Sequence, residues 1–163
     1  MKRVACLLAT LGTFSAACDG FGSEPLCGPT RAFVDRVIDG DTVVLEDGER
    51  VRSLLIDAPE TTGGEIECFG EEATRFKADL VLGREVELIY DEQCRDRYGR
   101  LLAYLVVEGR DVSELFVERG FACVLHIPPN GADRVDHFRE LEARARDEGR
   151  GMWGACLEVP CAN

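Results

Sequence analysis

The sequence predicts an α+β fold, a five-stranded β-barrel accompanied by about three α-helices. Two observations lead to this prediction. Runs rich in β-branched residues, separated by tight turns, occur up to about Val107, and apolar residues recur at helical spacing in three other segments. The first three strands are joined by turns too short for crossover helices, so a small closed barrel fits better than a parallel α/β sheet.

The expected strands lie at residues 34–38, 42–45, 51–56, 85–90 and 101–107, with a further short strand at 121–125. Thr42-Val43-Val44-Leu45 is typical, because β-branched residues suit the pleated, half-buried surface of a sheet. Glu46-Asp47-Gly48-Glu49 indicates a hairpin turn before the third strand. Pro128-Pro129-Asn130-Gly131 forbids regular structure and predicts a loop.

The expected helices lie at residues 71–82, 111–119 and 132–148. In the first, Ala73, Phe76 and Leu80 share one face, and Gly83 is placed to end the helix. Asp111 is placed to cap the free N–H groups at the start of the second helix.

The chain is acidic. It has 163 residues and a formal net charge of −12, from 31 acidic and 19 basic residues. Its length is sufficient for one domain with a real core. A chain with this charge lacks the positive surface by which proteins bind nucleic acids non-specifically. Any anionic substrate must therefore be held by a local group of basic residues.

The first residues have the order of a secretory signal. Lys2 and Arg3 precede an apolar run at residues 4–14 that is too short to span a bilayer, and Ser15-Ala16-Ala17 follows it. We therefore expect a signal peptide over residues 1–17, export, and a tether over residues 18–31. Two alternatives remain open. Cys18 becomes the lipidated first residue of a cell-surface or outer-membrane lipoprotein, or the chain is simply cleaved and secreted to the periplasm or medium.

Eight cysteines favour an oxidising compartment. If Cys18 carries lipid, six others remain downstream: Cys27, Cys68, Cys94, Cys123, Cys156 and Cys161. Six cysteines can form three disulfides, and the residues alone leave the pairing open. A thiolate metal site is the weaker alternative, because no C-x-x-C motif is present and the two histidines are not at zinc-finger spacing.

Carboxylates gather at the ends of two predicted strands. Asp39 and Asp41 follow the first strand, and Asp57 and Glu60 follow the third. Bunched carboxylates repel one another unless a cation joins them, and hard oxygen ligands suit Ca²⁺. The alternative is that Asp-Gly-Asp-Thr is only a turn.

Two arginines favour a phosphate site. Arg52 lies inside the third strand, where an unpaired guanidinium group is costly, and Arg100 follows a turn before the fifth strand. Guanidinium groups bind phosphate through paired hydrogen bonds, so two of them beside an oxygen-bound cation would make a phosphodiester site. The alternative for Arg52 is a structural salt bridge to Asp57 or Glu60.

Five motifs occur in one order along the chain: V-I-D-G-D-T-V, V-R-S-L-L-I-D-A-P-E-T, E-C-F-G-E-E-A-T-R-F, D-R-Y-G-R-L-L-A-Y and G-M-W-G. In order and approximate spacing they resemble the thermonucleases, the staphylococcal-nuclease-like calcium-dependent nucleases built on an OB-fold barrel. The resemblance covers residues 34–156. It implies a nuclease domain over residues 32–157 and a C-terminal tail over residues 158–163.

The resemblance implies a metal site and its ligands. Asp41, Asp57 and the backbone carbonyl of Ala58 would bind Ca²⁺, and Asp39 would lie behind these ligands. A threonine is common in the family at the position of Ala58, but a ligand supplied by the backbone survives that change.

It also implies the catalytic groups. Glu60 would orient or deprotonate the attacking water, while Arg52 and Arg100 would bind the phosphate and stabilise the charge of the transition state. The reaction would hydrolyse DNA or RNA and leave 3′-phosphate ends. Ser53 stands where the family usually has leucine, and it should point to the face opposite Arg52.

Substrate contacts are where the chain departs from the family. The best-known member stacks nucleotide groups on two tyrosines, where this chain has Leu125-His126-Ile127-Pro128. His126 is the ring available there for substrate binding, with a surface loop residue as the alternative. Tyr98 and Arg97 remain as contacts for a terminal phosphate. With the acidic charge, these features favour short single strands over long duplexes.

The sequence thus predicts an exported, monomeric, Ca²⁺-dependent nuclease. The alternative is a catalytically inactive OB-fold module that binds nucleic acid or a protein partner; the whole set of candidate side chains favours the enzyme. The resemblance also suggests the disulfide pairs Cys123 with Cys156, Cys68 with Cys94, and Cys27 with Cys161.

Overall fold

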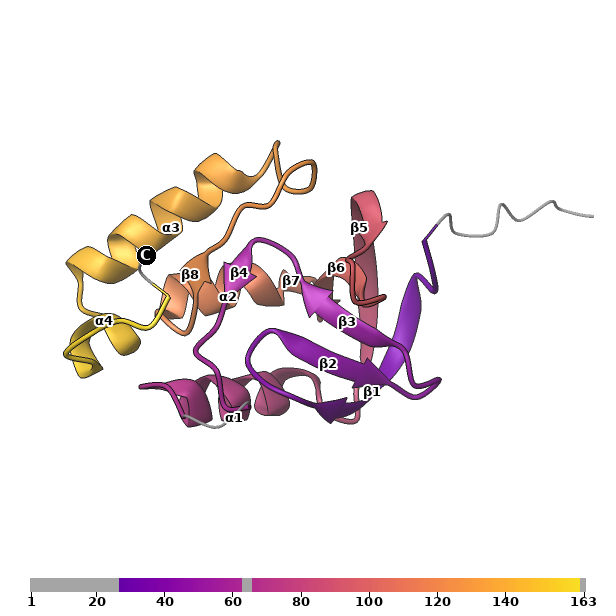
Figure 1. Cartoon of the computed structure of the whole chain (residues 1–163), viewed down its shortest axis with the longest axis horizontal. Helices are drawn as coiled ribbons and strands as arrows, with labels where there is room; N and C mark the ends of the chain where they lie inside the picture. The colour runs from indigo at the N-terminus through magenta and orange to yellow at the C-terminus, as the bar shows by residue number, and fades with distance from the viewer. Residues whose placement is uncertain (1–26, 63–65, 162–163) are drawn as a thin grey trace, which may run out of the picture.

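A closed five-stranded barrel forms the centre of the molecule in the computed structural model, which describes residues 27–62 and 66–161 (Figure 1). The sheet order is β3-β2-β1-β5-β6, and β3 pairs in parallel with β6 to close the ring. All other barrel pairings are antiparallel. The expected barrel with helices is confirmed. Its strands are β1 (Arg31–Val37), β2 (Thr42–Leu45), β3 (Arg50–Ser53), β5 (Glu85–Arg95) and β6 (Leu101–Val107).

The third expected strand is divided in two. It was expected over residues 51–56, but β3 ends at Ser53 and a separate strand, β4, covers Ile56–Asp57. Leu55 between them has a φ of 62°, a left-handed conformation that a strand cannot contain. The turn carries β4 away from the barrel to pair with β8 (Cys123–Val124). The break thus places Asp57 beside the barrel mouth.

Three longer helices surround the barrel, close to the expected positions. α1 (Gly70–Val81) lies at the bottom of the view in Figure 1, α2 (Val112–Arg119) packs against β6 and α3, and α3 (Val135–Asp147) lies at the upper left. Asp111 caps α2 as expected, because its carboxylate accepts hydrogen bonds from the N–H groups of Ser113 and Glu114 at 2.7 and 3.2 Å. The two-residue β7 (Arg110–Asp111) and the four-residue α4 (Met152–Ala155) complete the fold.

The buried face of α1 includes the expected one but is centred beside it. Ala73, Lys77 and Val81 are fully buried, whereas Phe76 and Leu80 are partly buried and pack against the core. The apolar pattern therefore located the side of the helix that meets the core but did not identify Lys77 as part of it. The barrel core itself consists of apolar side chains from every strand of the ring, including Val34, Val43, Val51, Val86, Leu88, Leu101, Ala103 and Leu105.

Three disulfides link distant parts of the chain, and all three expected pairings are wrong. Cys27 bonds Cys94, Cys68 bonds Cys156, and Cys123 bonds Cys161, with Cα–Cα distances of 5.0, 6.0 and 5.8 Å. A disulfide requires Cα atoms within about 7 Å. The expected pairs followed an alignment of segments, which places a cysteine on an element but says little about which other cysteine lies within that distance.

The ends of the domain extend beyond the expected limits. Residues 27–31 were assigned to a tether, yet Cys27 is bridged to β5, the Tyr90 hydroxyl donates to the Pro29 carbonyl at 2.8 Å, and β1 begins at Arg31. At the other end, Cys161 is bridged to β8. The signal peptide, Cys18 and the rest of the tether lie outside the described residues. Within the described ranges, no helix is long and apolar enough to cross a membrane.

These bridges generate a stability prediction. Replacing Cys27 and Cys94 together by serine should lower the free energy of unfolding by about 2–4 kcal/mol, since the unfolded chain loses a constraint across a long loop. Urea titration of the oxidised parent and the variant measures the difference. Peptide mapping without reduction should recover the 27–94, 68–156 and 123–161 linkages, and recovery of the 68–94 linkage would contradict this structure.

Candidate active site

The turn between β1 and β2 holds two buried carboxylates. Asp39 Oδ1 accepts hydrogen bonds from the N–H groups of Asp41 and Thr42 at 3.0 and 2.7 Å, which fixes the turn. Gly40 between them packs closely: a Cβ there would lie 2.5 Å from the Ala58 Cβ and 3.2 Å from the Ala73 Cβ. The turn is therefore seated between β4 and α1, and Asp41 is turned toward the barrel mouth.

Arg52 joins the two predicted ligand carboxylates. Its Nε lies 3.1 Å from Asp41 Oδ1, and its Nη2 lies 3.2 Å from Asp57 Oδ1. Its Nη1 donates to the carbonyls of Ser53 and Ile56 at 2.9 and 2.6 Å, across the turn that separates β3 from β4. The alternative of a salt bridge to Asp57 is thus observed, together with one to Asp41, while the carboxylate of Glu60 is not a partner.

Thr42 connects Arg100 to the same group. The Thr42 hydroxyl donates to Asp41 Oδ1 at 2.8 Å and accepts from Arg100 Nη1 at 3.3 Å. Arg100 Nε also bonds Asp96 Oδ2 at 2.7 Å. Among the described residues Nη2 of Arg100 has no acceptor, so this nitrogen can bind a ligand. Asp57, Arg52, Asp41, Thr42 and Arg100 form one continuous array, which we call the rim array.

Two carboxyl groups of the site have raised pKa values. Burial, and then the charge of Asp41, raise the pKa of Asp39 to about 6. Burial also raises the pKa of Asp57, against the nearby charge of Arg52, which lowers it. In both groups the larger cause is burial, which disfavours the charged form. An added cation would lower both pKa values.

The donor set fits a hard cation with few protein ligands. Asp41, Asp57 and the carbonyl of Ala58 supply oxygens, which Ca²⁺ prefers. Within residues 27–62 and 66–161, however, no three His, Cys, Asp or Glu side chains are grouped as a metal cage would require. Two carboxylates and a carbonyl would leave much of the coordination to water and substrate, so binding would be weak.

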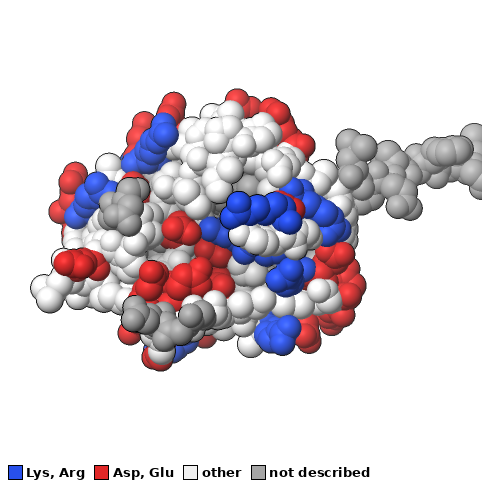
Figure 2. All heavy atoms as spheres, viewed as in Figure 1, with Lys and Arg blue, Asp and Glu red and all other residues white. Residues whose placement is uncertain are grey.

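A pocket of about 520 Å³ opens beside the rim array. One side is polar and cationic, formed by residues of the rim array and the β5–β6 turn: Arg52, Asp96, Arg97, Tyr98 and Arg100. The other side is apolar and includes Leu54, Leu102, Leu125 and Ile127. Figure 2 shows basic side chains gathered over the β3 and β5 side of this face, next to acidic side chains between β4 and α1. The acidic chain thus carries the local cationic surface that an anionic substrate needs.

A family model described as staphylococcal nuclease homologue matches residues 50–155. The chain belongs to the staphylococcal nuclease homologue family. Endonuclease YncB of Bacillus subtilis (strain 168) is 36% identical over 126 residues, covering 74% of this chain and 60% of that protein. The thermonuclease of Staphylococcus intermedius is 34% identical over 122 residues, covering 72% and 70%. An uncharacterized endonuclease of Escherichia coli O157:H7 is 34% identical over 144 residues, covering 86% and 88%.

The chain spans only part of some relatives. It covers 60% of the first B. subtilis protein and 43% of the SPbeta prophage-derived endonuclease YokF from the same organism. The family match itself includes β3, Arg52, Asp57 and Arg100, and the identity with these relatives extends over most of the barrel domain. Membership in the family therefore rests on the segment that carries most of the site described above.

Two of the three residues predicted to contact substrate line the pocket. Tyr98 and Arg97 line the pocket, with Arg97 Nη2 bonded to the Tyr98 hydroxyl at 2.6 Å. His126 does not line it, and its Nε2 is buried without a hydrogen-bond partner among the described residues. Leu125 and Ile127 line it instead, because alternate side chains of an extended segment point to opposite sides. His126 therefore lies outside the pocket lining, and its role in substrate binding stays a prediction.

Glu60 lies apart from the rim array. Its carboxylate accepts from the Thr62 hydroxyl at 3.2 Å, and its N–H donates to Glu67 Oε2 at 2.7 Å. Among the described residues it makes no ion pair or hydrogen bond with either arginine. Glu60 follows Asp57, the last residue of β4, by three positions, so the chain brings it near the site although no contact ties it to the rim array among the described residues.

Sequence reasoning missed two features of the site. Thr42 is the link between Asp41 and Arg100, and a hydroxyl directly after a ligand carboxylate is the signal that could have found it. Lys77 is fully buried on α1 and donates to the Ser53 hydroxyl at 2.8 Å, directly behind Arg52. Its signal was a charged residue four positions after the buried Ala73, on the same helical face.

The packing of Gly40 gives a test of this site. Gly40→Ala should lower the free energy of unfolding by about 1–3 kcal/mol, because its Cβ overlaps that of Ala58 and the turn must shift. Adding Ala58→Gly removes the overlapping atom and should recover part of the loss. Urea titrations of the two single variants and the double variant measure this coupling; strictly additive effects would contradict the packing described.

Proposed function

We propose that the chain is a Ca²⁺-dependent nuclease that hydrolyses phosphodiester bonds of nucleic acids and leaves 3′-phosphate ends. One observation carries the proposal: the rim array joins two carboxylates to two guanidinium groups, and both guanidinium groups line a pocket of about 520 Å³. Carboxylates suit a cation and guanidinium groups suit phosphate oxygens. The names of the endonuclease and thermonuclease relatives support the coarser part of this proposal, a nuclease.

Asp41, Asp57 and the Ala58 carbonyl would hold Ca²⁺, with Asp39 fixing the turn behind them. When bound, the ion polarises a phosphoryl oxygen and neutralises charge on the substrate. Arg52 already engages both ligand carboxylates, so its first task is to hold them in place. This arrangement explains how two like charges can stay close together before a cation arrives.

Arg100 acts on the phosphate. Asp96 and Thr42 fix its guanidinium group, and Nη2 remains available for an oxygen of the substrate. A preorganised donor stabilises charge as it develops in the transition state without having to reorganise at that moment. Water attacks phosphorus, its proton passes to Glu60, and the bond from phosphorus to the 5′ oxygen breaks as that oxygen takes a proton from solvent. The 3′ side keeps the phosphate.

The proposed substrate is single-stranded DNA or RNA. A formal net charge of −12 opposes a long duplex, whereas a flexible strand can place one phosphate at the rim array and a base against the apolar side of the pocket. We further propose that the protein is exported and acts as a monomer, held to a membrane only if Cys18 is lipidated. Three disulfides support an oxidising compartment.

The activity test uses the full chain with end-labelled single-stranded DNA, duplex DNA and RNA. Hydrolysis should require free Ca²⁺ at about 10⁻⁴ to 10⁻³ M, because the protein offers few ligands. It should stop in chelator and be slow in Mg²⁺, which demands stricter octahedral geometry. Analysis of product ends identifies the broken bond. Full hydrolysis in chelator would reject the metal assignment, and binding without hydrolysis would favour the inactive-module alternative.

Arg100→Lys tests the phosphate contact. Lysine keeps the positive charge but loses the planar fork, so kcat should fall by roughly 10²- to 10³-fold, the range for removal of one preorganised donor. Melting temperature and Ca²⁺ affinity should change little, since Arg100 is not a ligand.

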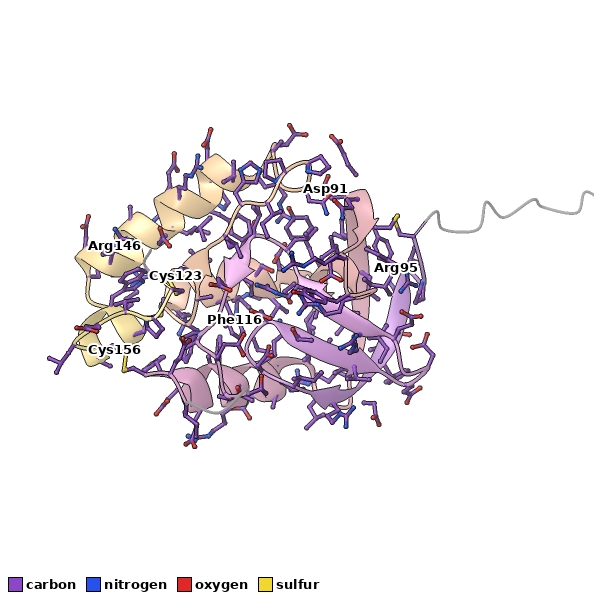
Figure 3. All side chains as sticks on the ribbon, in the orientation of Figure 1. Asp91, Arg95, Phe116, Cys123, Arg146 and Cys156 are labelled. Atoms are coloured by element: carbon purple, nitrogen blue, oxygen red, sulfur yellow. A yellow bond between two sulfur atoms is a disulfide. The ribbon has the colours of Figure 1, made fainter. Side chains whose placement is uncertain are left out.

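Arg95→Lys is the matched control for this variant. Arg95, labelled in Figure 3, is the last residue of β5 and binds Glu49 and the Gly99 carbonyl, neither of which belongs to the rim array. Its replacement should leave kcat nearly unchanged. Equal, small effects of both substitutions would mean that Arg100 serves only as the partner of Asp96.

A further inference from the structure

Lys77 is a buried charged residue to which the mechanism proposed above assigns no role. It is 0% exposed, on the face of α1 that covers the barrel. Arginine provides every other basic residue from Arg31 onward, so the described domain uses its single lysine where no solvent reaches it. A lysine side chain is costly to bury, and it is not needed here to fill space.

The ammonium group of Lys77 has two close contacts. Its Nζ donates to the Ser53 hydroxyl at 2.8 Å and lies 5.0 Å from the centre of the Phe116 ring. Phe116 lies in the interior between α2 and α1 (Figure 3). The family usually has leucine where Ser53 stands, and the sequence placed Ser53 on the face opposite Arg52. In the structure, the Ser53 hydroxyl on that face accepts the hydrogen bond from the buried Lys77 ammonium group.

Ser53 is in direct contact with two members of the rim array. Its N–H donates to the Asp41 carbonyl at 2.8 Å, and its carbonyl accepts from Arg52 Nη1 at 2.9 Å. A force on the Ser53 side chain is therefore transmitted to both residues. Ser53 thus connects the Lys77 ammonium group, in the protein interior, to Asp41 and Arg52 of the rim array.

The charged groups that act on Lys77 come mainly from the candidate site. Burial lowers the pKa of Lys77 to about 8, against the carboxylates of Asp41, Asp39 and Asp111, which raise it, while Arg52 lowers it. The groups facing it from the β1–β2 turn and the start of α2 are thus acidic, and the one from β3 is basic. The ammonium form persists at neutral pH because those carboxylates offset part of the cost of burial.

We propose that Lys77 is a positioning residue for phosphodiester hydrolysis, which supports the rim array from inside the protein through its hydrogen bond to Ser53 and its charge beneath Asp41. This inference rests on the proposed nuclease function. Lys77 does not touch substrate or metal. It holds the β3 end against the β1–β2 turn, and it supplies a second buried positive charge, after Arg52, to a site rich in carboxylates.

The first experiment needs no activity. A full chain with Lys2→Arg has Lys77 as its one lysine, so ¹⁵N-lysine labelling gives one side-chain signal. Titration in chelator should place the pKa of Lys77 near 8, and Asp41→Asn should move it lower because a stabilising carboxylate charge is removed. A pKa near the ordinary value of lysine, unchanged by Asp41→Asn, would overturn the inference even if the chain proves to be a nuclease.

The second experiment measures kcat at saturating Ca²⁺ from about pH 6.5 to 9.5, a range that brackets the pKa of Lys77. Lys77→Met alone would leave the buried Ser53 hydroxyl without its hydrogen-bond partner. The variant to use is therefore Lys77→Met with Ser53→Ala, in which both partners become apolar and folding is retained. Its kcat should be about tenfold lower than that of the parent near pH 7. The ratio should shrink to about twofold or less by pH 9.5, where the parent has lost the Lys77 charge as well.

Arg75→Met is the matched control, since it removes one positive charge from the exposed side of the same helix. It should leave kcat unchanged at every pH. A merely structural Lys77 would give a ratio of parent to double variant that does not vary with pH, together with a lower melting temperature, and that result would overturn the inference. If the parent hydrolyses no substrate, the proposed function fails, and the titration still decides the coupling of Lys77 to Asp41.

Discussion

The guanidinium group of Arg52 lies between two carboxylates at the point where a barrel strand ends. It binds Asp41 from the first turn and Asp57 from the strand after the break, while its remaining nitrogen binds the carbonyls of that break. Without it, the buried carboxylate of Asp41 and the partly exposed carboxylate of Asp57 would repel each other beside a turn with unpaired carbonyls. Removing Arg52 would also leave the buried Asp41 charge without its ion-pair partner, so the fold of this corner and the layout of the site depend on the same residue.

The barrel could be predicted because its cause is local. β-Branched runs and short turns appear in the sequence, and both act over a few residues. The break at Leu55 could not be predicted in this way, since nothing in Leu54-Leu55 disfavours a strand. It arises because Arg52 and the pairing of β4 with β8 stabilise a conformation that leucine would otherwise avoid.

The candidate site, too, has features that follow from local sequence and features that depend on the folded structure. The sequence drew attention to Asp41, Asp57, Arg52 and Arg100 because charged residues beside buried strands are unusual, and the structure brings the four together. His126 was considered for its ring, but the side of the segment that it occupies depends on how that segment lies against the pocket. The cysteine pairs failed for a similar reason: they join segments that meet only in the finished fold.

The order of those cysteines along the chain has one more consequence. The loop closed by Cys27 and Cys94 overlaps the loop closed by Cys68 and Cys156, which in turn overlaps the loop closed by Cys123 and Cys161. Every peptide bond between Cys27 and Cys161 therefore lies inside at least one covalent ring. A protease that cuts any single one of them leaves two pieces still joined, so a nick in an exposed turn does not release a fragment of the domain.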